Sequence, residues 1–249
     1  MDRHISTSRT LHRLLPQNHQ SFDRLRIRLN LLKIQPSTIK NRELEISEEE
    51  SRLYPSQIFQ RNIAKKLEEE FLDILQRAIP ENILDLPENK PLIKYESQMR
   101  MEPIYSPICD VAVGPFSFRR ENYNDIYLRL AKLHQIKRFI ASIKEVSLTF
   151  ADDVDPLGYN NNPRCFLSIE VENRTAKDIK HLLGSITNCS LMGKIGVVIV
   201  FDDYIDYAKR LLKYISFVEQ DAKKLDEKLF RNIFVIRKSD LSNILQIRE

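Results

Sequence analysis

The stretch FLSIEVENR, Phe166 to Arg174, decides how the second half of this chain is interpreted. Its residues at positions 167, 169 and 171 are apolar, which predicts one buried face of a strand spanning Cys165–Glu172. The opposite face begins apolar and ends acidic, with Glu170 and Glu172 at its carboxyl-terminal end. Two carboxylates on one face repel each other unless a cation is present, so the stretch indicates either a solvated strand surface or part of a metal site.

The segments after this strand predict an α/β domain. Ile195–Phe201 is apolar on both faces, as in a central strand of a parallel sheet. Further strands and helices alternate along the chain, so we expect a sheet that is covered by helices on both faces. The remaining expected elements are a helix over 176–192 that ends at Gly193, a helix over Tyr204–Val218, a strand over Asn232–Ile236 and a short final helix capped by Ser239.

The first half of the chain predicts a basic N-terminal segment, residues 1–54, followed by one α/β domain, residues 55–249. Alternation in Leu25–Leu31 indicates a half-exposed strand. Residues 1–42 hold nine basic and two acidic side chains, which suits either phosphate contact or a solvated arm. The other expected elements are a helix over Pro55–Ala78, strands near Leu92–Tyr95, Ile108–Val113 and Val146–Phe150, and a helix over 121–144 that forms an insertion at about 120–145.

The composition is that of an ordinary globular protein. Of the 249 residues, 42% are hydrophobic and 30% are charged, and the net charge is +4. Apolar runs are far shorter than the ~20 residues that a membrane helix needs, and the first residues lack the apolar core of a signal peptide. The three cysteines form no CxxC pair, which suits a reducing compartment. We therefore expect a cytoplasmic protein without membrane contact.

Several familiar motifs are absent from the sequence. With five glycines the chain has no GxGxxG and no GxxxxGK[ST], so no nucleotide cofactor is expected. It also lacks the GxSxG and HExxH patterns of serine hydrolases and zinc proteases. The remaining candidates for catalytic or metal-binding residues are therefore carboxylates on strands.

Asp110 is a lone acid within the apolar segment Ile108–Val113. Burying an unpaired carboxylate is costly, so Asp110 needs a partner. An ion pair with Arg119 or Arg120 would satisfy it, and so would a metal ion shared with Glu170 and Glu172. Oxygen ligands of this kind suit Mg²⁺ or Mn²⁺.

Asp110 in PICDVAVGP, followed by IEVEN, a helix and an apolar strand, resembles the restriction-endonuclease-like superfamily, the PD-(D/E)xK nucleases. The resemblance covers roughly residues 107–236. It implies a restriction-endonuclease-like core, with a mixed central sheet flanked by helices and extra N-terminal elements. It also implies that Asp110 and Glu170 bind Mg²⁺ or Mn²⁺, while Glu172, at the position of the family's lysine, acts as the base.

The function implied by this resemblance is metal-dependent hydrolysis of phosphodiester bonds in DNA, by an endonuclease whose catalytic residues are Asp110, Glu170 and Glu172. A homodimer is left open. The alternative is a catalytically inactive nuclease-fold protein that serves as a DNA-binding or protein-interaction module, because the motif lysine is missing. An unrelated α/β protein with structural acids is the third reading.

Several basic residues near the motif are candidates for related roles. Arg174, Lys177 and Lys180 are expected to contact nucleic acid, and Arg174, Lys177 or Lys194 could replace the missing lysine. An arginine stays protonated at neutral pH and would bind phosphate rather than act as a base.

Other polar and small residues have simpler interpretations. Cys109 and Cys165 are expected to be small core residues, and Gly184 to allow close packing of its helix on the sheet. Surface positions are expected for Glu68, Glu69, Glu70 and His181, and a solvated loop for Asp152, Asp153 and Asp155. The resemblance leaves open that a glutamate of the helix, among Glu68–Glu70, joins the site.

Overall fold

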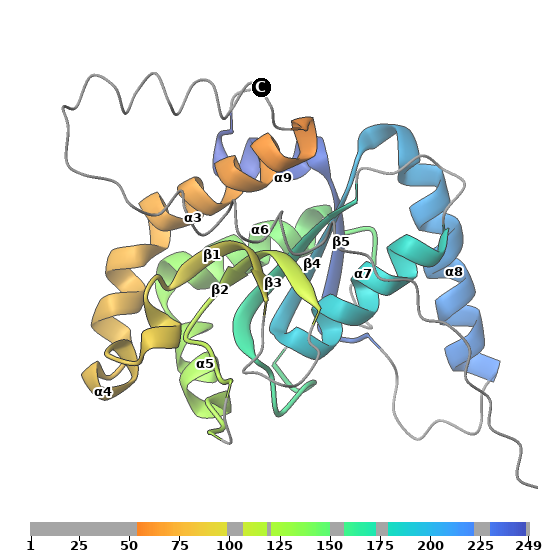
Figure 1. The fold of residues 1–249 in the computed structure, drawn as a ribbon. Coiled ribbons are helices and arrows are strands. Elements are labelled where there is room, and N and C mark those ends of the chain that lie inside the picture. The colour runs from red at the N-terminus through yellow and green to blue at the C-terminus, as the bar shows by residue number, and fades with distance from the viewer. Residues whose placement is uncertain are drawn as a thin grey trace, which may run out of the picture. The chain divides into compact units, whose positions relative to one another are not determined.

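A computed structural model describes residues 54–98, 107–118, 121–149, 157–172, 179–221 and 230–247 of the chain (Figure 1). These ranges all belong to one compact unit, Leu53–Glu249. The predicted strand at Leu25–Leu31 and the basic N-terminal segment lie outside the described residues. No helix in the described ranges is long and apolar enough to cross a membrane.

The centre of this unit is a mixed sheet, as expected, and the sheet has five strands. The strands follow one another in space in the order of the sequence. The first two pairings are antiparallel and the last two are parallel. The strands are β1 (Ile93–Gln98), β2 (Ile108–Val113), β3 (Cys165–Glu172), β4 (Gly193–Val200) and β5 (Ile233–Arg237).

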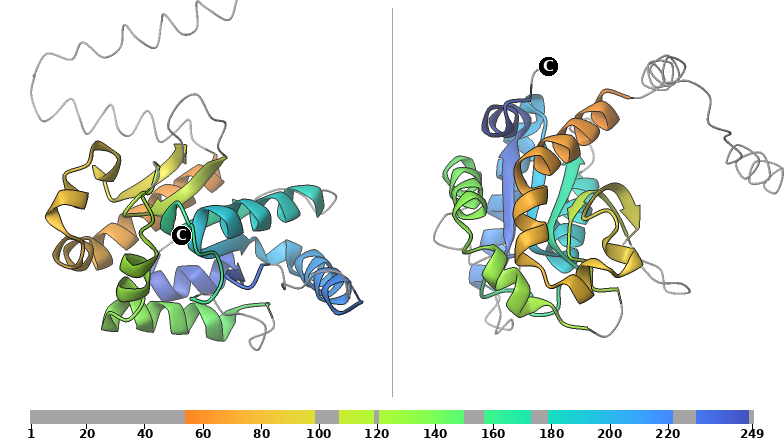
Figure 2. Two further views of the ribbon diagram at one scale, coloured as in Figure 1. Left: turned by 90° about the horizontal axis from the view of Figure 1, so that it is seen from below. Right: turned by 90° about the vertical axis from the view of Figure 1, so that its left-hand side faces the viewer.

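Helices cover both faces of the sheet (Figure 2). On β4, the side chains of residues 195, 197 and 199 enter one apolar core, and those of 198 and 200 enter another. The first core is closed by α3 (Pro55–Ala78), α5 (Asn124–Leu130), α6 (His134–Val146) and α9 (Lys238–Leu245). The second is closed by α7 (Ile179–Met192) and α8 (Ile205–Asp221). The shorter helical segments are α4 (Glu81–Leu84), η1 (Pro87–Asn89) and η2 (Asp202–Tyr204).

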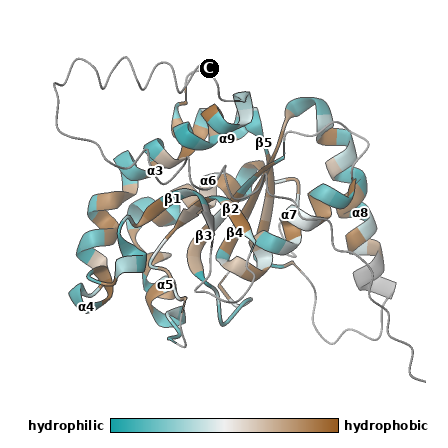
Figure 3. Cartoon of the chain, viewed as in Figure 1, coloured by the Kyte–Doolittle hydropathy of each residue, from teal (hydrophilic) through white to brown (hydrophobic). Residues whose placement is uncertain are grey.

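Strand β4 is buried along its whole length, which confirms the prediction of a central strand. The strands at the centre of the sheet are largely apolar in colour, whereas teal stretches mark the helices around them (Figure 3). Burial of this apolar surface is the main favourable contribution to folding.

The prediction of one helix over 121–144 is wrong in one respect. The segment forms two helices, α5 and α6, and the chain turns between them at residues 131–133. Leu133 adopts an extended backbone and its carbonyl accepts the N–H of Lys137. Both helices direct their apolar residues into the same core, so apolar spacing alone does not show the break.

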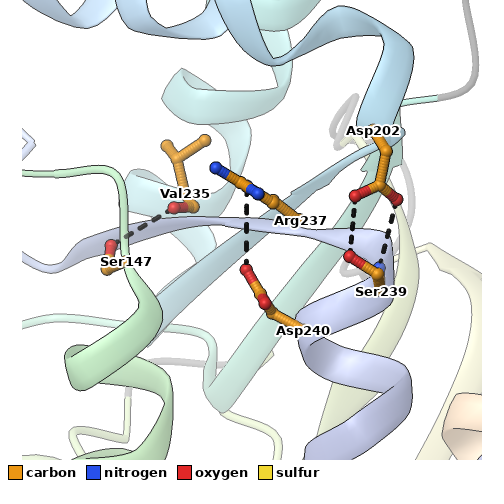
Figure 4. A network of polar contacts seen from close by, with 6 residues as sticks. All are labelled: Ser147, Asp202, Val235, Arg237, Ser239 and Asp240. Carbon is orange, nitrogen blue, oxygen red and sulfur yellow. Dashed lines mark hydrogen bonds and ion pairs between the residues drawn. The ribbon is translucent and has the colours of Figure 1, made fainter.

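The predicted strand at Val146–Phe150 is also not formed in its described part. Helix α6 runs to Val146, and Ser147–Thr149 has no strand structure. The segment instead approaches the outer edge of β5, where the Leu148 N–H donates to the Val235 carbonyl at 2.7 Å. The Ser147 hydroxyl donates to the same carbonyl at 3.3 Å (Figure 4). One shared acceptor does not make a ladder.

Two predicted helix ends differ in the structure. Gly193 does not end α7 as a separate cap, because it is the first residue of β4. Ser239 does not cap α9 with its own side chain. Asp202 accepts the Ser239 backbone N–H at 3.4 Å and the Ser239 hydroxyl at 2.6 Å (Figure 4). A carboxylate at a helix N-terminus satisfies free N–H groups and suits the helix dipole.

Close packing of α7 on the sheet depends on Gly196 rather than Gly184. A Cβ built on Gly184 would have no heavy atom within 4 Å, so its small size is not needed. A Cβ on Gly196 would collide with the Ile233 side chain and lie 2.9 Å from the Cβ of Cys189 in α7. The glycine that permits the approach is therefore on the strand.

We expect Gly196→Ala and Gly184→Ala to change stability in opposite directions. The first forces a methyl group into a filled core and should lower the free energy of unfolding by about 1–3 kcal/mol. The second adds a better helix former at an open position of α7 and should raise it by up to about 1 kcal/mol. Urea unfolding of both variants measures the difference, and equal effects would contradict this packing.

Candidate metal centre

The side chains of Asp110 and Glu170 meet between β2 and β3. The registered pairs of these antiparallel strands run from Val113–Leu167 to Val111–Ile169, so Asp110 lies one step beyond the last pair, next to Glu170. One oxygen of Asp110, Oδ2, accepts the backbone N–H of Val171 at 2.7 Å. The two carboxyl groups are within hydrogen-bonding reach of each other. The two acids predicted to hold a metal are thus brought together.

The pair is enclosed largely by protein. Glu170 is 8% exposed. Two residues before it on β3, Ser168 contacts the thiols of Cys109 and Cys189, at 3.3 and 3.5 Å. Cys109 and Cys165 are fully buried, as predicted. Among the described residues, no lysine or arginine forms an ion pair with Asp110 or Glu170, whereas Arg119 and Arg120 lie outside that part of the chain.

Burial and mutual repulsion favour the protonated forms of both acids. Burial, the largest cause, followed by the charges of Asp110 and Glu172, raises the pKa of Glu170 to about 9. Burial also raises the pKa of Asp110 to about 6, although the hydrogen bond from Val171 opposes the shift. Without a cation, the pair therefore retains a proton at neutral pH.

Two buried oxygen atoms beside this pair lack a hydrogen-bond partner. One is Oε1 of Glu170, and the other is Oε1 of Gln60, a residue of α3 that is 6% exposed. Gln60 also lies within hydrogen-bonding reach of Asp110. Buried acceptors without donors are costly and mark places where a water or an ion belongs. Oxygen atoms from two carboxyls and an amide match the ligands of Mg²⁺ and Mn²⁺.

Glu172 is close to the pair but has a different partner. Its charge contributes to the raised pKa of both Asp110 and Glu170. Its Oε1 accepts a short hydrogen bond from the hydroxyl of Ser185 in α7. Within the described ranges, no three His, Cys, Asp or Glu side chains are arranged to hold a metal. The acidic pair is thus the centre of the site, and Glu172 lies beside it.

The other predicted residues lie in varied places. Lys180 is exposed in the first turn of α7, whereas Arg174 and Lys177 lie outside the described residues. Lys194 is fully buried near the start of β4, and its ammonium donates to the carbonyls of Tyr159 and Asn160 at 2.8 and 3.1 Å. It therefore lies at the opposite end of the parallel strands from Glu172 and does not replace the missing lysine.

Residues with simpler predicted roles are mostly where the sequence places them. Glu68–Glu70 and His181 are exposed, and Glu69 pairs with Lys66 at 2.7 Å. Asp152, Asp153 and Asp155 lie outside the described ranges.

Gln60 is the residue of the site that sequence reasoning missed. It lies three residues before Ile63 and seven before Leu67, and all three are buried in α3. A polar side chain on the apolar stripe of a helix needs a partner in the core. The polar residue on the apolar stripe of α3 was therefore the feature of the sequence that could have identified Gln60.

The raised pKa of Glu170 predicts a pH-dependent stability in the absence of divalent cations. Between about pH 4.5 and pH 9 the folded protein retains a proton that the unfolded chain has released. Stability therefore falls as the pH rises through this window, and the Glu170 proton contributes at most ~1.4 kcal/mol per pH unit. Glu170→Gln should remove this loss and be more stable than the unmodified protein at pH 8.

Urea unfolding in the presence of a chelator, from pH 5 to pH 9, measures this effect. Glu69→Gln is the control, because Glu69 is exposed and should leave the pH dependence unchanged. If the Glu170→Gln protein kept the pH slope of the unmodified protein, the Glu170 carboxyl would not be the group whose raised pKa causes that slope.

Comparisons of the chain with protein-family models, with curated proteins and with solved structures find no match. The geometry of the acidic pair is therefore the feature that bears on function.

Proposed function

We propose that this protein is a metal-dependent nuclease that hydrolyses phosphodiester bonds in DNA. The observation that carries the proposal is the pair of half-buried Asp110 and buried Glu170, with an oxygen of Glu170 that has no partner. Two acids in one largely enclosed place are costly for stability, because they can both ionise only when a cation balances their charge. A divalent cation would satisfy both carboxylates and the free oxygen.

The order of elements supports the restriction-endonuclease-like interpretation. An aspartate on β2, an acidic strand β3, the helix α7 and the strand β4 follow in the order that the resemblance implies. Strands β3 and β4 are parallel, so α7 is a crossover helix. In this interpretation Asp110 and Glu170 hold Mg²⁺ or Mn²⁺.

The remaining groups would act on the substrate. When bound, the cation polarises the phosphate and lowers the pKa of water beside it. Glu172, whose Oε1 is held by Ser185, takes the proton of the water that attacks phosphorus. The P–O bond to the leaving oxygen then breaks, and that oxygen takes a proton from solvent. Lys180 is exposed at the start of α7 and, with Arg174 and Lys177, would contact backbone phosphates.

The second candidate is a catalytically inactive nuclease-fold protein that binds DNA or another protein. The observation in its favour is Glu172, which stands where the family has a lysine and is tied to Ser185. Such a protein would bind DNA without cleaving it.

We expect the purified protein to cleave plasmid DNA with Mg²⁺ or Mn²⁺, and Glu170→Gln to lower the rate by at least ~100-fold, since it removes a charged metal ligand. Because Glu170→Gln should be folded and more stable at pH 8, its loss of activity would not reflect unfolding. Glu69→Gln should cleave normally.

Two outcomes would contradict this assignment. Equal cleavage by the unmodified and Glu170→Gln proteins would show that the activity comes from elsewhere. Binding of DNA in a gel-retardation assay that weakens steeply with salt, with no cleavage in Mg²⁺ or Mn²⁺, would favour the inactive DNA-binding module.

A further inference from the structure

Gln60 is a polar residue in a position that otherwise takes apolar side chains. The buried residues of α3 are Phe59, Gln60, Ile63, Leu67, Phe71 and Leu75. All except Gln60 are hydrophobic and belong to the main core. An amide placed here has lost its contact with water, and it needs partners at both its NH₂ group and its oxygen.

The Gln60 amide lies beside Asp110. The side chains of the two residues are within hydrogen-bonding reach of each other. Oε1 of Gln60 is buried and has no hydrogen-bond partner. Glu170 Oε1 is in the same situation, and the Glu170 carboxyl is within reach of the same Asp110. The unsatisfied atoms of this region are therefore both oxygens that need a donor or a cation.

No third acid, histidine or cysteine completes the site with Asp110 and Glu170 among the described residues. Glu172, the expected third carboxylate, accepts the hydroxyl of Ser185. An amide oxygen adds a ligand without a further negative charge, so it does not increase the repulsion between Asp110 and Glu170.

We propose that the side-chain oxygen of Gln60 is the third protein ligand of a divalent cation held by Asp110 and Glu170. This inference rests on the proposed metal site but not on nuclease activity. In the cation-free protein the Gln60 amide lies within reach of Asp110, and on binding its oxygen turns to the cation. The ligands then come from a helix and two strands, so the cation links α3 to β2 and β3.

A role for Gln60 as a hydrogen-bond donor to Asp110 alone is the competing explanation. A donor that only positions Asp110 would not move when the cation binds. The side-chain ¹⁵NH₂ signals of Gln60, assigned by their loss in Gln60→Leu, report whether the amide responds to the cation. Gln60→Glu, which keeps an oxygen but loses the donor, distinguishes the two roles. Coordination should shift the ¹⁵NH₂ signals on Mg²⁺ addition as the amide oxygen turns to the cation. Signals that stay in place while Mg²⁺ binds would overturn the proposal.

Calorimetric titration of metal-free protein with Mn²⁺ gives a second measurement. We expect Gln60→Leu to weaken binding by about tenfold or more, which is the loss typical of even an indirect contact to a metal. Gln60→Glu, which keeps an oxygen in place, should bind at least as tightly as the unmodified protein. Gln76→Leu is the matched control, because Gln76 is exposed on the same helix and should have no effect.

The outcomes separate this inference from the proposed function. Unchanged Mn²⁺ affinity in Gln60→Leu, with binding lost in Glu170→Gln, would overturn the role of Gln60 and leave the acidic pair as the metal site. No Mn²⁺ binding by the unmodified protein would overturn both. The leucine introduced by Gln60→Leu is compatible with the apolar residues around position 60. Thermal unfolding without metal checks that this variant is folded.

Discussion

The two hydrogen-bonded ladders of β3, antiparallel to β2 and parallel to β4, place this strand inside the sheet with helices over both faces. Every residue from Cys165 to Val171 is buried as a result, including Glu170. The sheet therefore does not allow this carboxylate to reach water freely. The raised pKa values, the partners of Asp110 and the properties of the site follow from that constraint.

The chain accommodates the buried charge by bringing polar groups to it rather than by exposing it. Asp110 is held by the Val171 N–H, and Glu170 lies against Asp110. This arrangement still leaves two oxygens without partners. Apolar residues here would avoid this cost, and the residual cost is the basis of the proposed metal site.

The groups around the pair come from both sides of the sheet. Gln60 belongs to α3, which closes one core, and Ser185 belongs to α7, which closes the other. Elements more than a hundred residues apart in the sequence thus set the surroundings of two neighbouring carboxyls. Close packing at Gly196 fixes α7 against the strands and with it the position of Ser185.

The sequence by itself determined the α/β class, the buried strand β4, the acidic end of β3 and Asp110 as an acid in an apolar strand. These features depend on local periodicity and on the cost of burying a charge, which a single chain displays. The break between α5 and α6, the capping of α9 by Asp202, the diversion of Glu172 to Ser185 and the approach of Gln60 were decided only by the tertiary structure. Each depends on contacts between distant segments, and spacing along the chain carries no information about which polar group such a contact will satisfy.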